Sequence, residues 1–163
     1  MLHSCFHALW ALRLCTWLGV GNDPRYTSST TFETFPFPEG LTPNIPAIEY
    51  AEDPRAQRIA VAARRLDELR NNWLNPPGLV VCVPEVVEGY PDRILPKDQA
   101  AEQILKKRTL TNLYNERPAW LTHAHRDLDA AVAAAYGWPP DLSDDEVLSQ
   151  LLTLNHTRAH TQK

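Results

Sequence analysis

The stretch DPRAQRIAVAARRLDELRNNWLNPP, residues 53–77, carries the clearest helix pattern in the chain. Asp53 is a favourable N-cap residue, and the proline after it is well tolerated at the first helical position. Apolar residues then recur at alternating steps of three and four, at Ala56, Ile59, Ala62, Leu66, Leu69 and Trp73. This spacing places them on one face, as in helices that pack antiparallel against one another. Asn75, Pro76 and Pro77 predict the end of the helix, because proline removes a backbone donor.

Three further helices are predicted downstream of this one. The first begins near Lys97 and carries apolar residues at Ala101, Ile104, Leu105, Leu110 and Leu113. The second begins at Pro118, and its apolar face consists of Leu121, Ala124, Leu128, Ala131 and Ala135. It ends at Gly137, because glycine readily adopts the left-handed conformation of a helix C-cap.

Ser143 and Glu146 have the spacing of a capping box, which predicts the start of the last helix. The apolar face of that helix consists of Val147, Leu148, Leu151, Leu152 and Leu154. Residues 79–96, which contain Pro84 and Gly89, predict a short strand or extended segment. Together these elements predict a mainly α fold with about four antiparallel helices.

The opening stretch MLHSCFHALWALRLCTWLGV, residues 1–20, resembles a signal peptide only at first sight. It has no basic region before the apolar run, carries Arg13 inside it and lacks a small-residue cleavage site. It is also too short and too polar to span a bilayer. Phe6, Leu9, Trp10, Arg13 and Trp17 recur at helical spacing, so a buried amphipathic helix is expected.

The stretch TTFETFPFP, residues 30–38, cannot form a regular helix. Pro36 and Pro38 each remove a backbone donor and fix their own φ, and they push the preceding phenylalanines toward extended geometry. Three phenylalanines in this stretch are also too costly to leave in water. We therefore expect a rigid, extended connector whose aromatic rings, Phe32, Phe35 and Phe37, are buried.

Composition limits the classes of protein to which the chain can belong. At 163 residues with 44% apolar content, it suits one ordinary domain, or a small domain plus a fragment, and wholesale disorder is excluded. The net charge of -4 gives no global electrostatic case for nucleic-acid binding, so any contact with DNA must come from a local patch. Three widely spaced cysteines, Cys5, Cys15 and Cys82, provide no disulfide framework and favour a reducing, cytoplasmic compartment.

Four stretches in fixed order resemble a known family: LWALRLCTWLGVGNDPRYTSSTTFETFPFP (9–38), RNNWLNPP (70–77), LKKRTLTNLYNERPAWL (105–121) and AAYGWPPDLSDDEVLSQLLTLN (134–155). They resemble the C-terminal portion of class I S-adenosylmethionine-dependent DNA methyltransferases of the fused restriction–modification, MmeI-like type. The resemblance implies that residues 1–38 are the end of an incomplete target-recognition domain, a small α/β piece. It further implies a linker at 39–54, a helical C-terminal domain at 55–158 and a frayed tail at 159–163.

The catalytic motifs of that family are not found in this sequence. The family binds S-adenosylmethionine through a Gly-rich turn, but GVG at residues 19–21 lacks the third glycine of such a turn. Its catalytic loop is Asx-Pro-Pro-aromatic, whereas Asn75-Pro76-Pro77 is followed by Gly78, which has no ring to stack on a flipped base. We therefore expect no catalytic residue, no cofactor bound by this chain and no activity of the chain alone.

Histidines at i, i+4 spacing, His3 with His7 and His156 with His160, do not predict a metal site. A zinc site needs three or four convergent ligands with Cys or carboxylate support, and no such set is suggested at ligand spacing. Surface or capping histidines are the simpler interpretation, and no metal site is predicted.

Seven residues are candidates for contact with DNA: Arg25, Tyr26, Arg64, Arg65, Lys106, Lys107 and Arg108. Arginine can bind a phosphate or a guanine edge, and tyrosine can donate a hydrogen bond or stack. The alternative for Arg25 and Tyr26 is a buried tyrosine covered by the arginine. For the basic runs, the alternative is an ordinary solvated helix face.

The resemblance implies a C-terminal fragment of an adenine-specific DNA methyltransferase that contributes to target binding and domain support. Its expected partners are DNA, bound weakly by the chain alone, and the methyltransferase core or other missing parts of the parent enzyme, with no membrane. The alternatives are a free-standing helical protein-interaction module and a decayed gene product, neither with a role at DNA.

Overall fold

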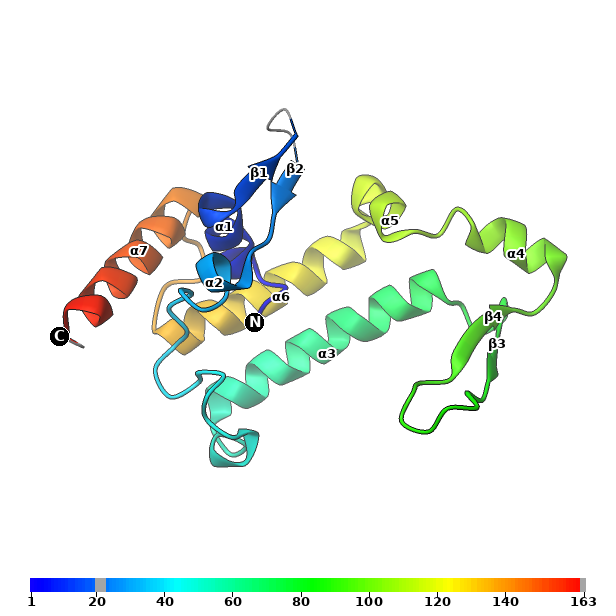
Figure 1. Ribbon diagram of the computed structural model, residues 1–163, viewed down its shortest axis with the longest axis horizontal. Helices are drawn as coiled ribbons and strands as arrows, with labels where there is room; N and C mark the ends of the chain where they lie inside the picture. The colour runs from blue at the N-terminus through cyan, green and yellow to red at the C-terminus, as the bar shows by residue number, and fades with distance from the viewer. Residues whose placement is uncertain (20–22, 162–163) are drawn as a thin grey trace. The chain divides into compact units, whose positions relative to one another are not determined.

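The structure is a computed structural model that describes residues 1–19 and 23–161 (Figure 1). The described residues contain seven α-helices and two two-stranded sheets, which confirms the predicted mainly α class with a small α/β piece. The helices are α1 (Cys5–Leu14), α2 (Ser28–Thr31), α3 (Pro54–Leu74), α4 (Gln99–Leu105), α5 (Leu110–Glu116), α6 (Ala119–Tyr136) and α7 (Asp144–Thr161). The strands are β1 (Thr16–Leu18), β2 (Asp23–Arg25), β3 (Val80–Val83) and β4 (Arg93–Pro96), and a 3-10 turn covers Ala47–Glu49. Val20 and Gly21 of the GVG stretch lie outside the described residues.

The chain forms two compact units. The first unit contains residues 1–63 and 125–163, and the second contains residues 64–124. Helices α3 and α6 each continue along the chain from one unit into the other. The division into a recognition-domain end, a linker and a helical domain at residues 38 and 55 stays a prediction.

Helix α3 begins and ends where the sequence predicts. Asp53 Oδ1 accepts a hydrogen bond from the backbone N–H of Arg55 at 2.8 Å, so Asp53 is the N-cap and Pro54 the first helical residue. The helix ends at Leu74, directly before Asn75-Pro76-Pro77. Ile59 and Leu66 are buried on its apolar face, and this confirms the predicted stripe.

The caps of α6 and α7 are also as predicted. Gly137 has a φ of +74°, and the N–H of Trp138 donates to Ala133 O at 2.9 Å, which closes α6 in a left-handed C-cap. At the start of α7, Glu146 Oε2 accepts from Ser143 N at 2.8 Å and from Ser143 Oγ at 2.7 Å. Helix α7 continues to Thr161, so residues 159–161 of the predicted tail are helical.

Two helix predictions need correction. The helix expected from Lys97 to Leu113 is two helices: α4 ends at Leu105 with Lys106 as its C-cap, and Thr109 is the N-cap of α5. The Oγ1 of Thr109 accepts from the backbone N–H of Asn112 at 3.1 Å. The N-terminal helix ends at Leu14, since Cys15 adopts an extended conformation, and Trp17 lies in β1 with 54% of its surface exposed.

Phe35 and Phe37 of residues 30–38 are buried as predicted, whereas Phe32 is only partly buried, and the segment is less extended than expected. Thr30 and Thr31 complete α2, and the N–H of Phe37 donates to Phe35 O at 2.9 Å, which makes a tight turn around Pro36. Phe35 and Phe37 are 4% and 9% exposed, and their rings meet edge to face at 4.9 Å.

Side chains from α6 and α7 hold the backbone of this segment. Tyr136 Oη donates to Pro36 O at 3.1 Å, and Arg158 Nη1 donates to Phe37 O at 2.6 Å. Asn155 Nδ2 donates to Thr34 O at 2.7 Å. Because the two prolines cannot donate, carbonyl acceptors are the polar groups that the segment offers to its neighbours.

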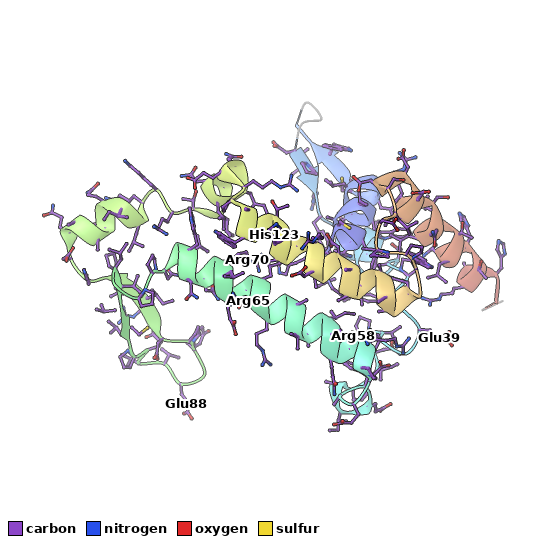
Figure 2. All side chains as sticks on the ribbon, turned by 180° about the vertical axis from the view of Figure 1, so that it is seen from behind. Glu39, Arg58, Arg65, Arg70, Glu88 and His123 are labelled. Carbon is purple, nitrogen blue, oxygen red and sulfur yellow. The ribbon has the colours of Figure 1, made fainter. Side chains whose placement is uncertain are left out.

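The predicted excursion at residues 79–96 is a hairpin of β3 and β4, which are antiparallel with Val81 opposite Leu95. Glu88, labelled in Figure 2, lies in the loop between the two strands. Within the described part of the chain, no helix has both the length and the apolar character that crossing a membrane would require.

Candidate nucleic-acid interface

Arg25 and Tyr26 lie at the end of the short β1–β2 hairpin of the first unit. Arg25 is opposite Thr16 in the strand pairing and is exposed to solvent. Tyr26 is 52% exposed, and its hydroxyl lies 3.1 Å from His7 Nε2, within hydrogen-bond distance. The tyrosine is therefore not buried beneath the arginine. Both side chains can reach a ligand from solvent.

His7 of α1 positions Tyr26, and sequence reasoning missed this role. The imidazole is only 4% exposed and meets the Phe35 ring edge to face at 4.8 Å. Burial, and then the positive charge of the Met1 amino group, lower the pKa of His7, so the ring is neutral at pH 7. Its Nδ1 has no hydrogen-bond partner among the described residues. The only sequence signal was the His3–His7 spacing, which points to metal binding rather than to this contact.

Arg64 and Arg65 are exposed on α3 in the second unit. Arg65, labelled in Figure 2, belongs to the part of the helix that also carries Asp67 and Glu68. Arg70 bonds to Asp67 at 3.6 Å, so the cations of this segment lie among carboxylates. This pattern agrees with a solvated helix face as well as with phosphate contact.

The three basic residues at 106–108 differ in their surroundings. Arg108 Nη1 donates to Trp73 O at 2.5 Å, and its guanidinium lies 5.1 Å from the centre of the Trp73 ring. This contact places a cation at the C-terminus of α3, which the helix dipole favours. Lys106 Nζ bonds to Glu102 Oε1 at 2.9 Å. Lys107 is exposed, and within the described residues its ammonium has no partner.

A pocket of about 410 Å³ lies beside these residues in the second unit, lined by Trp73, Gln103, Ile104, Lys107, Arg108 and Glu116. The two cations share it with the Glu116 carboxylate, which opposes the binding of an anion. Lys106 and Arg108 already bind Glu102 and Trp73. Lys107 is therefore the residue of this basic run that is best placed to contact a phosphate.

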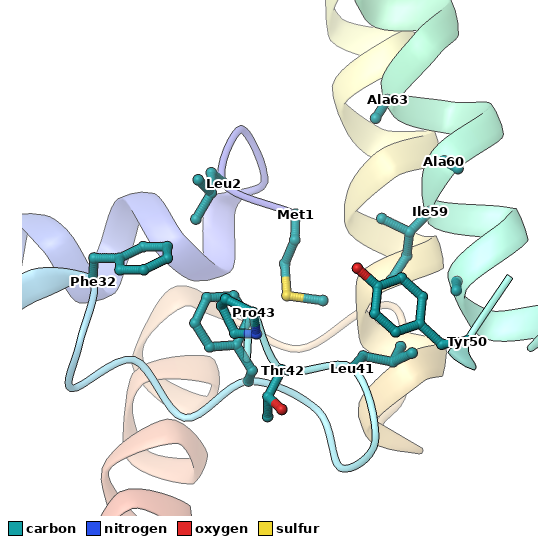
Figure 3. Close-up of a pocket in the computed structure, with 12 residues that line it drawn as sticks. Met1, Leu2, Phe32, Leu41, Thr42, Pro43, Tyr50, Ile59, Ala60 and Ala63 are labelled. Atoms are coloured by element: carbon teal, nitrogen blue, oxygen red, sulfur yellow. The ribbon is translucent and has the colours of Figure 1, made fainter. Parts of the chain in front are cut away.

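The first unit contains an apolar pocket of about 430 Å³ (Figure 3). Figure 3 shows the Tyr50 ring turned toward Met1 and Ile59. Thr42 and Tyr50 supply hydroxyl groups, and no described residue of the lining has a charged side chain. Such a lining contains no carboxylate, imidazole or basic side chain for acid–base or phosphate chemistry.

The Cys5 thiol is also unsuited to chemistry. Burial, and then the nearby Asp129 carboxylate, raise the pKa of Cys5 to about 12, so the thiol stays protonated at neutral pH. Asp129 Oδ1 accepts from the backbone N–H of Cys5 at 2.7 Å, and burial raises the pKa of that carboxyl. Across residues 1–19 and 23–161, no group of three or more His, Cys, Asp or Glu side chains has metal-binding geometry.

Comparison of the chain with protein-family models, curated proteins and solved structures finds no match. The methyltransferase resemblance therefore rests on the four sequence stretches alone. The geometry adds one pair of exposed residues in each unit that suits DNA contact: Arg25 with Tyr26, and Arg64 with Arg65.

Proposed function

We propose that the chain is the C-terminal part of an adenine-specific DNA methyltransferase of the restriction–modification type. In this role it contributes to target binding and domain support. The observation that best supports the proposal is the adjacent, exposed pair Arg25–Tyr26, whose tyrosine is hydrogen-bonded to buried His7. The parent reaction moves a methyl group from S-adenosylmethionine to the exocyclic amine of a flipped adenine. The donor and the catalytic loop belong to the missing part of the enzyme.

In this proposal the two side chains have different tasks. The Arg25 guanidinium binds a phosphate or a guanine edge, and Tyr26 stacks on a base or donates to one. The hydrogen bond between Tyr26 and His7 limits the freedom of the phenol ring, so less entropy is lost on binding. A cytoplasmic location agrees with the three free thiols of the chain.

Support for the alternative function, a helical interaction module, comes from apolar side chains in solvent. Val81, Val86, Val87 and Ile94 of the β3–β4 hairpin are each at least 46% exposed, and groups of exposed apolar side chains are common where a protein partner binds. This alternative predicts no affinity for DNA.

The two functions are separated by fluorescence anisotropy with a labelled duplex at several salt concentrations. We expect weak, mostly non-specific binding through three or four phosphates, with a log–log salt slope of about -3 to -4. Arg25→Ala should weaken binding and reduce the magnitude of the slope by about 0.9, the value for one phosphate contact. Arg126→Ala, at an exposed arginine beside Asp127, is the matched control and should leave both unchanged.

Absence of any duplex binding would overturn the proposal in favour of the interaction module. A sub-micromolar, sequence-selective complex at physiological salt would show instead that the chain holds a complete reader. Calorimetry with S-adenosylmethionine should give no binding heat, and a stoichiometric complex would contradict the assignment of the donor site to the missing part.

A further inference from the structure

The β3–β4 hairpin of the second unit exposes apolar side chains on both faces. Val81 and Leu95, which are paired on one face, are 46% and 41% exposed. Ile94, paired with Cys82 on the other face, is 50% exposed. A two-stranded hairpin alone is marginally stable in water, and a third strand or a packed face normally completes it. Among the described residues, no third strand pairs with this sheet.

The two open edges of the hairpin differ in their ability to accept a strand. Lys97 N–H donates to Leu79 O at 3.0 Å, so residues 79, 81 and 83 direct their backbone groups toward β4. Val80 and Cys82 consequently direct theirs toward the open edge of β3. On β4 the corresponding outward positions are Ile94 and Pro96, and Pro96 has no N–H to donate. The β3 edge, which keeps both of its outward N–H groups, is therefore the better edge to extend the sheet.

We propose that β3 pairs antiparallel with β3 of a second copy of this chain, with the two-fold axis at Val81. In this register Val80 of one copy exchanges both backbone hydrogen bonds with Cys82 of the other. The two Val81 side chains then face each other at a non-hydrogen-bonded position. They join Leu95 of each copy in one apolar row across four strands.

A second copy suits this edge because the segment Leu79–Val83 carries no charge. When such a strand pairs antiparallel with itself, no like charges are opposed. The pairing is isologous, so it closes at the dimer, and the proline in each β4 edge disfavours further growth. Because the strand is short, the dimer is weak and its population depends on concentration. The proposal does not depend on a role at DNA.

Sedimentation velocity over a wide range of protein concentration tests the dimer. The wild-type chain should pass from monomer to dimer as concentration rises, whereas Val81→Lys should remain monomeric because two ammonium groups would be opposed at the axis. Leu95→Lys is the matched control on the same face. Its two charges would be separated by three strand spacings, about 14 Å and beyond the Debye length of about 10 Å, so it should still dimerise.

Cross-linking tests the register. In a Cys82→Ser background, Val81→Cys should form a disulfide-linked dimer when diamide is added as oxidant. Opposed Cα atoms at a non-hydrogen-bonded position are about 4.5 Å apart, which lies within the range for disulfides. Leu95→Cys in the same background should form none. Wild-type protein that is monomeric at every concentration, or a Val81→Lys variant that dimerises like wild type, overturns the proposal.

Discussion

Residues 30–38 and residues 79–96 are both rich in proline and apolar side chains, yet the structure treats them in opposite ways. The first segment buries Phe35 and Phe37 and offers its carbonyls to donors from α6 and α7. In the second, Val86 is 90% exposed and Tyr90 is 70% exposed. The difference shows that apolar composition alone does not determine burial. Donors that are 100 and 121 residues distant in sequence hold the first segment, and none of the described hydrogen bonds to the second comes from so far.

Phe35→Ala should give the largest loss of stability. The ring is 4% exposed and contacts His7, Trp10 and Phe37, so its removal leaves a cavity. We expect the free energy of unfolding in urea to fall by about 3–5 kcal/mol. Val86→Ala is the matched truncation in the exposed hairpin and should change it by less than about 0.5 kcal/mol. Equal losses for the two variants would remove the contrast between the segments.

Leu128→Ala and Leu66→Ala extend this test to the helix faces predicted from the sequence. Leu128 is 0% exposed and Leu66 is 1% exposed. Each substitution should lower the free energy of unfolding by about 2–5 kcal/mol. Leu12→Ala, at a leucine that is 54% exposed, controls for the change in helix propensity. A loss of only a few tenths of a kcal/mol at Leu128 or Leu66 would show that the stripe is not core.

Tyr136→Phe should have a smaller effect, since it removes only the hydrogen bond to Pro36 O. The ring stays stacked on Trp138, with ring centres 4.4 Å apart in the wild type, so packing is kept. We expect a loss of about 0.5–1.5 kcal/mol in urea denaturation. Tyr90→Phe makes the same change on an exposed ring and should be neutral. If both variants are neutral, the carbonyls of residues 30–38 do not need this donor.

Local signals in the sequence predicted the helices well. Asp53, Gly137 and the Ser143–Glu146 box each act within four residues of themselves, and the structure places all three as expected. The start of α5 also has a local signal, the N-cap residue Thr109. The apolar pattern across residues 101–113 continues past this cap, so the sequence analysis predicted one helix there. Periodicity detects an apolar face and does not detect a cap inside it.

Long-range contacts were the part that the sequence could not predict. The hydrogen bonds of His7 to Tyr26 and of Tyr136 to Pro36 join residues 19 and 100 positions apart. No spacing rule connects such pairs, because their distance depends on how the helices pack. For the same reason, the run at 106–108 looked uniform, although Arg108 contacts Trp73 and Lys106 contacts Glu102.

The buried His7 should make stability depend on pH. Its pKa is lowered in the folded state, first by burial, while the unfolded value is near 6.5. As pH falls below about 6.5, the unfolded chain takes up a proton that the folded chain does not, so stability is lost with acidification. The loss ends below the folded pKa. His7→Gln should remove this component from the curve of unfolding free energy against pH.

His123→Gln is the control for that experiment, because His123 is exposed on α6 (Figure 2). It should leave the difference in stability between pH 7.5 and pH 5.5 as in the wild type. Asp129, whose pKa is raised by burial, acts in the opposite sense: its contribution falls as pH rises above about 3.8. A His7→Gln variant with an unchanged curve would show that the imidazole does not titrate differently on folding.

The smallest expected effect separates two neighbouring lysines in the second unit. Lys106 is paired with Glu102, whereas Lys107 lines a pocket and is free of partners among the described residues. If the run at 106–108 faces DNA, Lys107→Ala should reduce the magnitude of the duplex salt slope by about 0.9, and Lys106→Ala by less, because Glu102 already neutralises that charge. Arg108 is left unchanged, since its loss would also disturb the end of α3. Equal slopes for both variants and the wild type would identify the run as a solvated turn after α4, and would leave Arg25, Tyr26, Arg64 and Arg65 as the candidates for contact with DNA.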